Sequence, residues 1–208
     1  MPLPRQLDAI EIRVLGALME KEQATPEYYP LTLNALLAAC NQKNNRSPVL
    51  DLAEHTVREA LERLAHEVLV WRSEGVRVER WRHSTARRWE LDPPAKALLT
   101  LLMLRGPQTA AELKSRAERM HVFSTLEEAE QVLARMAAGG DPLVTLLARR
   151  PGQVEPRWMH LLGGPVAEAP EPVVETAAGS LATRVERLEQ EVASLGERLA
   201  ALVAQLGG

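Results

Sequence analysis

The chain has 208 residues, 46% of them apolar and 25% charged, which is typical of a folded protein and excludes a disordered or fibrous one. A net charge of −3 excludes a strongly basic protein that coats nucleic acid through bulk charge. A single cysteine excludes an internal disulfide and a cysteine-based zinc site.

No stretch of the sequence suggests export or membrane insertion. The first residues lack the basic start and unbroken apolar run of a secretory signal. The best apolar run, residues 95–104, contains Lys96 and is about half as long as the roughly twenty residues that span a bilayer. We therefore expect a cytoplasmic protein with no membrane partner.

Three helices are predicted in the first part of the chain. Asp8 is a suitable N-cap for the first helix, in which apolar residues recur at helical spacing. The second and third helices are predicted over residues 31–41 and 54–67, each with apolar residues on one face. A polar loop, residues 41–48, separates them.

The pattern then changes to that of strands. Residues 68–71 are rich in β-branched and aromatic side chains, Gly75 indicates a turn, and alternation over residues 76–81 leads to a second strand that we expect to end at residues 88–91. Three helices followed by a β-hairpin is the order of a winged helix-turn-helix domain. We predict one such domain over residues 1–91.

The same order repeats about 72 to 77 residues later, too long a period for a solenoid. The second copy is predicted as a helix beginning at Pro93-Pro94, a helix over 109–119, a helix from Ser124 or Thr125 to about 139, and strands at 143–147 and 157–162. Residues 92–162 are thus predicted to be a second winged-helix domain. The expected fold class is mainly α with small β-hairpins (α+β).

Residues 163–179 are rich in Pro, Ala and Glu and are predicted to be a flexible linker. Residues 180–208 carry a heptad pattern sustained for almost four heptads, with the apolar positions Leu181, Val185, Leu188, Val192, Leu195, Leu199, Leu202 and Leu206. This seam predicts a coiled-coil helix and a homodimer. The alternative is that the helix folds back on its own domains.

Several strings resemble the YceH-like proteins, a bacterial family with a domain of unknown function. They are Thr25-Pro26-Glu27-Tyr28-Tyr29-Pro30-Leu31, Ala39-Cys40-Asn41-Gln42-Lys43, Asn45-Arg46, Pro48-Val49, Arg105-Gly106, Gln108-Thr109, Glu112-Leu113, Arg116-Ala117, Arg119-Met120 and Met159-His160-Leu161. The resemblance covers nearly the whole chain. It implies a tandem winged-helix fold with a C-terminal heptad segment, and it carries over no activity or functional residues.

The sequence offers no catalytic constellation. None of the five histidines pairs at the spacing of three or four that a metal-binding helix uses, and there is no glycine-rich phosphate loop or nucleophile elbow. Cys40 lies on an apolar helical face, which favours a buried, inert thiol over a nucleophile. We expect a non-enzymatic protein without cofactor or metal.

Nucleic-acid binding is the leading hypothesis, because the first predicted hairpin is locally basic. The candidate phosphate contacts are Lys43 and Arg46 in the polar loop, and Arg72, Arg77, Arg80, Arg82, Arg87 and Arg88 in the hairpin. Trp81 could stack on an unpaired base, but packing across the hairpin is favoured for Trp71, Trp81 and Trp89. The loop asparagines 44 and 45 could read a base edge or satisfy loop amides. A DNA-associated protein of the transcriptional-regulator type would fit this pattern.

The third helices argue against ordinary major-groove reading. Residues 54–67 hold four glutamates against Arg58 and Arg63, and Glu127, Glu128 and Glu130 oppose one arginine in the second copy. Carboxylates brought toward phosphates are repelled. The competing hypothesis is therefore a protein-interaction adaptor that uses the winged helices as platforms and binds no nucleic acid.

Overall fold

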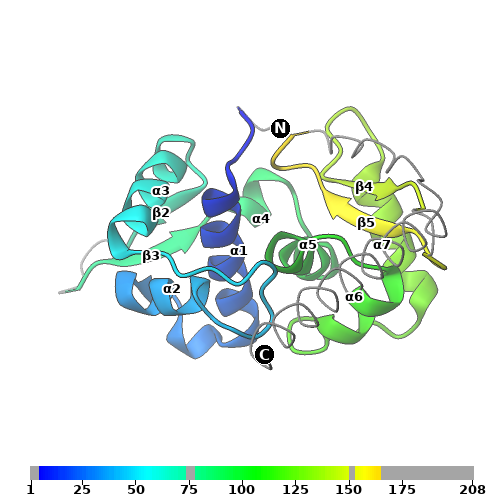
Figure 1. Cartoon of the computed structure of the whole chain (residues 1–208), viewed down its shortest axis with the longest axis horizontal. Helices are drawn as coiled ribbons and strands as arrows, with labels where there is room; N and C mark the ends of the chain where they lie inside the picture. Colours follow the sequence, from blue (N-terminus) through cyan, green and yellow to red (C-terminus); the bar gives the residue numbers. More distant parts are fainter. Residues whose placement is uncertain (1–4, 74–77, 150–152, 165–208) are drawn as a thin grey trace, which may run out of the picture. The chain divides into compact units, whose positions relative to one another are not determined.

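The computed structural model describes residues 5–73, 78–149 and 153–164, which form a mainly helical protein with small antiparallel sheets (Figure 1). The predicted α+β class is confirmed. The described residues all belong to one compact unit. The eight heptad positions from Leu181 to Leu206, most of the predicted linker and Arg77 lie outside the described residues.

The first half of the described chain runs from a long helix to a three-stranded sheet. Its elements are α1 (Ala9–Ala24), a 3₁₀ turn (Pro26–Tyr28), β1 (Leu31–Thr32), α2 (Leu33–Cys40), α3 (Glu54–His66), β2 (Val70–Arg72), β3 (Arg80–His83) and α4 (Thr85–Arg88). The sheet is antiparallel with the order β1-β3-β2, so β3 is its central strand. We call β2 and β3 the first hairpin.

Helix α1 begins where the sequence predicts. The Asp8 carboxylate accepts the amides of Ile10 and Glu11 at 2.8 Å each, and the Glu11 carboxylate accepts the Asp8 amide at 2.9 Å. This reciprocal capping box satisfies donors that have no partner inside the helix. Helix α2 begins two residues later than predicted, because Leu31 and Thr32 pair with β3.

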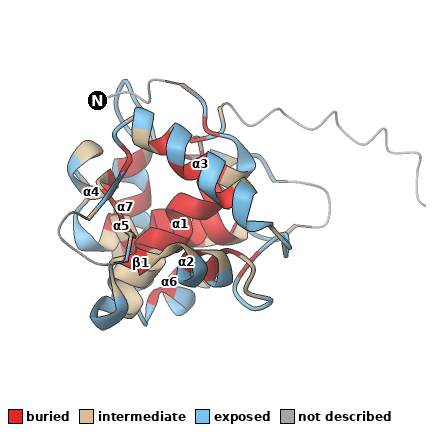
Figure 2. Ribbon diagram, turned by 90° about the vertical axis from the view of Figure 1, so that its left-hand side faces the viewer, coloured by how far each residue is buried: buried red, intermediate tan, exposed pale blue. Residues whose placement is uncertain are grey.

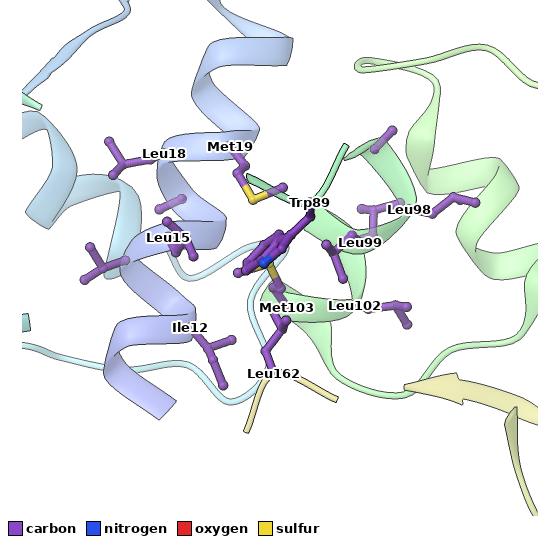
Figure 3. Close-up of a cluster of buried hydrophobic side chains, with 14 of the residues drawn as sticks. Ile12, Leu15, Leu18, Met19, Trp89, Leu98, Leu99, Leu102, Met103 and Leu162 are labelled. Atoms are coloured by element: carbon purple, nitrogen blue, oxygen red, sulfur yellow. The ribbon is translucent and has the colours of Figure 1, made fainter. Parts of the chain in front are cut away.

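The predicted second strand at residues 88–91 is wrong, because the strand is Arg80–His83 and a short helix follows it. The Ser84 amide donates to the Leu69 carbonyl at 3.0 Å, which ends the pairing, and the Trp89 amide then donates to the Thr85 carbonyl at 2.9 Å. Trp89 is buried, and its ring lies between α1 and the helix at residues 93–105 (Figure 3). In the sequence Trp89 stands between the charged residues Arg88 and Glu90, as an apolar residue of an alternating strand would. In the structure its side chain fills the core instead.

The second half repeats the order of three helices and a hairpin. Its elements are α5 (Pro93–Arg105), α6 (Ala110–Ala117), α7 (Leu126–Ala137), β4 (Val144–Leu147) and β5 (Arg157–His160). Asp92, Thr109 and Thr125 are the N-caps, and Gly106, with a φ of 71°, ends α5. Where the first half has β1, the second half has a single bridge between Gln108 and Trp158. We call β4 and β5 the second hairpin.

Helices α1 and α5 pack directly against each other at the centre of one core (Figure 3). Gly16 lets them approach closely, since a Cβ atom at this position would lie 3.1 Å from Leu104 Cδ2 and 3.2 Å from Met103 Cβ. Backbone bonds also join the two halves: the Leu7 amide donates to the Leu162 carbonyl at 2.8 Å. Figure 2 shows α1 buried along most of its length, whereas α3 keeps an exposed outer face. The two repeats therefore share their apolar interior.

Candidate nucleic-acid interface

Strand register decides which side chains of the first hairpin face solvent. Leu31 pairs with Trp81 and Val70 pairs with His83, and all four side chains are buried. Side chains alternate along a strand, so the intervening residues point to the opposite face. This outward face carries the four residues Trp71, Arg82, Arg80 and Thr32.

Trp71 and Arg82 are cross-strand partners on that face. Trp71 is 41% exposed, an uncommon state for so large an apolar side chain. Together with Arg72 and Ser73 the pair lines an open groove, and none of these four described residues is acidic. Arg82 gives the groove a positive charge, and Trp71 gives its wall an aromatic ring.

Two other arginines of the hairpin have protein partners. Arg72, whose side chain is 67% exposed, donates to Glu79 at 2.9 Å, and Glu79 also lies 4.0 Å from Arg58 of α3. Arg80 donates to the Pro30 carbonyl at 2.9 Å and is half-buried. The partner of Arg80 is a neutral carbonyl, so the positive charge of Arg80 remains. The partner of Arg72 is a carboxylate, so the positive charge of Arg72 is partly neutralised.

The structure removes Arg46 from the candidate phosphate contacts. Its side chain is fully buried, donates to both carboxylate oxygens of Glu20 at 2.5 and 3.1 Å, and donates to the Ala39 carbonyl. A guanidinium satisfied in this way cannot reach a phosphate. Lys43 in the same loop is exposed, and no bond to it is found in the described part of the chain.

The three asparagines of the polar loop differ in their contacts. The Asn41 side chain donates to the Leu52 carbonyl and accepts the Leu52 amide, both at 2.9 Å. Asn45 has a φ of 62° and accepts a hydrogen bond from Arg105. Asn44 is exposed. Asn45 therefore has a structural partner, but this partner is the Arg105 side chain of α5 and not a loop amide.

The remaining arginines are not part of the outward face. Arg87 is exposed and Arg88 is half-buried, and both belong to α4, which lies beside α1 at the far end of β3 from the hairpin tip (Figure 1). The eight predicted contacts thus do not form one ridge. Among the described residues, Arg80 and Arg82 share the outward face.

The three tryptophans for which the sequence favours packing across the hairpin have different outcomes. Trp89 is buried, but it follows α4 and packs between α1 and α5 instead of across the hairpin (Figure 3). Trp81 is 6% exposed and packs in the core, so the packing interpretation is confirmed for Trp81. It is wrong for Trp71, which faces solvent. Alternation counted from the buried Val70 would have found Trp71, because the next residue on a strand must point outward.

The acidic face of α3 lies next to the hairpin. Glu54, Glu59 and Glu62 are all exposed, and Arg58 is shared between Glu54, at 2.9 Å, and Glu79. Arg63 is paired with Asp8 and Glu11. The outer face of α3 is therefore negative, which disfavours its entry into a major groove.

A second polar cluster ties the hairpin to the core. His83 Nε2 lies 3.0 Å from Glu22 Oε2 and its Nδ1 lies 2.8 Å from Thr85 Oγ1, while Lys96 donates to Glu22 at 2.7 Å. The hydrogen bond between Glu22 and His83, together with that from Lys96, lowers the pKa of the Glu22 carboxyl to about 2, although partial burial acts to raise it. Thr85 is fully buried, so no substrate reaches its hydroxyl. The cluster serves as a clamp between β3, α1 and α5.

Cys40 is buried, and desolvation raises the pKa of its thiol to about 12, which agrees with an inert thiol. Within the described ranges there is no group of three or more His, Cys, Asp or Glu side chains placed to hold a metal ion. The helices described in this structure are all too short or too polar to cross a bilayer.

The fold defines a mainly α protein in which two helix–helix–helix–hairpin repeats share one core. The chain belongs to the family described as "Protein of unknown function, DUF480", whose model matches residues 7–153. It is 47% identical over 214 residues to a UPF0502 protein of Acidovorax sp. (strain JS42), covering 98% of this chain and 95% of that protein. It is 49% identical over 200 residues to a UPF0502 protein of Mesorhizobium japonicum, covering 94% of this chain and 96% of that protein. The resemblance to an uncharacterised bacterial family is confirmed.

Proposed function

We propose that this protein is a non-enzymatic, DNA-associated tandem winged-helix protein of the transcriptional-regulator type. The observation that carries the proposal is the outward face of the first hairpin, where Arg80 and Arg82 lie beside the exposed Trp71. Guanidinium groups on such a face can contact phosphates and release counterions.

The order of elements supports the winged-helix assignment. The first half runs as a helix, a short strand, two helices and a hairpin, and its three strands form a sheet with the order β1-β3-β2. The second half repeats three helices and a hairpin. The first hairpin would then be the wing. Of the 41–48 loop, Lys43 remains as a possible phosphate contact and Arg46 does not.

Binding measured against salt tests the proposal. Fluorescence anisotropy of a labelled DNA duplex and a labelled single strand would be followed between roughly 50 and 200 mM salt. The double variant Arg80→Ala, Arg82→Ala should reduce the slope of log K against log salt by about 1.8 on duplex, or about 0.9 for each lost phosphate contact.

Arg119→Ala is the matched control. Arg119 follows α6, is exposed and does not belong to the first hairpin. Its substitution removes one positive charge, as each of the two hairpin substitutions does. Its salt slope should equal that of the wild type. The proposal fails if the wild-type protein binds neither DNA at low salt.

A second candidate function is a protein-interaction adaptor, favoured by the exposed glutamates 54, 59 and 62 on α3. An acidic helix face suits a basic protein surface better than a phosphate backbone. A partner that stays bound to the full-length protein after nuclease treatment, and is lost on reversing the charge of Glu59 and Glu62, would favour this function over DNA binding.

A further inference from the structure

The groove beside Trp71 has the chemistry of a base-stacking site. Trp71 is 41% exposed and is the cross-strand partner of Arg82, while Ser73 adds a hydroxyl to the wall. An aromatic ring that stays in water is available to stack on any base, since every base has a π-face. Stacking needs a base that is not already stacked within a duplex.

Arg82 provides a cation without a protein partner. In the described part of the chain its guanidinium has no ion pair and no hydrogen bond to another side chain, and the residue lines the groove. A donor left in this state gains when a ligand brings an acceptor oxygen. A phosphate next to a stacked base would supply one.

The outward face favours an unpaired strand because of what a duplex hides. The bases of a duplex are stacked within it, so a duplex on this face could offer only its phosphates to Arg80 and Arg82. A single strand can offer both a phosphate to Arg82 and an unpaired base to Trp71.

We propose that the groove between Trp71 and Arg82 binds single-stranded nucleic acid, with the Trp71 indole stacking on an unpaired base and the Arg82 guanidinium contacting its phosphate. This inference rests on the proposed function and narrows its ligand to strands with unpaired bases. Both DNA and RNA single strands present this chemistry.

The test compares three labelled probes on the full-length chain at one salt concentration: oligothymidylate and oligouridylate of about 16 nucleotides, and a mixed-sequence duplex of about the same length. We expect the single strands to bind about tenfold more tightly than the duplex. The ratio between the two single strands shows whether the source is DNA or RNA.

Variants at the stacking position isolate the groove. Trp71→Ala should weaken single-strand binding about tenfold and duplex binding less than about twofold, whereas Trp71→Phe, which keeps a ring, should retain most of the affinity. The control is Leu146→Ala, which removes an exposed apolar side chain from the second hairpin. Single strands should also quench tryptophan fluorescence in the wild type, and this quenching should be lost in Trp71→Phe although binding remains.

Two results would overturn the inference, and they are distinguishable. If duplex binds as tightly as single strands and Trp71→Ala changes neither affinity, the groove is no stacking site while the proposed DNA association stands. If no probe binds at low salt, both the stacking site and the DNA association are wrong.

Discussion

Glu22 illustrates how one half-buried carboxylate joins three elements. It belongs to α1, accepts from Lys96 of α5 and lies within hydrogen-bond distance of His83 of β3. Tyr29 also contacts this cluster, because its hydroxyl accepts the His83 amide at 2.7 Å. The outward face of β3 therefore depends on a polar clamp on the opposite face of the same strand.

The lowered pKa of Glu22 predicts a specific pH dependence of stability. A carboxyl whose pKa falls from 4.5 to about 2 on folding stabilises the fold fully above pH 4.5 and loses this contribution as the pH falls toward 2. The difference in free energy of unfolding between the wild type and Glu22→Gln should therefore shrink between about pH 5 and pH 3 in denaturant titrations. Glu118→Gln, at an exposed position, is the control. If the difference in free energy of unfolding stays constant over this range, the lowered pKa of Glu22 and its contacts with His83 and Lys96 are contradicted.

At the scale of elements, two buried arginines fix the polar loop between α2 and α3 to the core. Arg13 of α1 donates to the carbonyls of Cys40 and Pro48 at 3.0 and 2.6 Å, and Arg46 bridges Glu20 and Ala39. The Ser47 amide also donates to the Leu104 carbonyl of α5 at 2.9 Å. The loop is thus an anchored part of the fold.

Arg46→Ala should lower the free energy of unfolding by about 3 kcal/mol, because it leaves the Glu20 carboxylate half-buried without its main partner. Lys43→Ala in the same loop should change it by less than about 0.5 kcal/mol. Guanidinium denaturation measures both. A stable Arg46→Ala protein with reduced DNA affinity would instead return Arg46 to the binding surface.

The sequence predicted features that depend on neighbouring residues better than features that depend on residues far apart in the chain. Caps depend on neighbouring residues, so the sequence alone located the cap at Asp8 and narrowed that of α7 to Ser124 or Thr125, of which the structure uses Thr125. The burial of Arg46 depends on Glu20, 26 residues earlier in the chain, and no local pattern indicates it. The end of the second strand was misplaced for a related reason, because the bond from the Ser84 amide to the Leu69 carbonyl that ends the pairing joins residues on different elements.

At the scale of the whole molecule, the heptad tail predicts a dimer that the described residues do not include. Deleting residues 180–208 should halve the mass measured by light scattering, because the apolar seam would no longer pair between chains. Lysine at both Leu188 and Leu195 should have the same effect without shortening the chain. An unchanged mass in both variants would mean that the tail packs within its own chain.

The packing of α1 against α5 has a practical consequence for mapping function. A fragment cut near residue 91 would expose the side of α1 that holds Leu15 and Met19, and burying each such side chain is worth about 2 kcal/mol. The fragment would tend to aggregate, and its failure to bind would report misfolding rather than a missing interface. Point substitutions on the intact chain are therefore the informative way to dissect this protein.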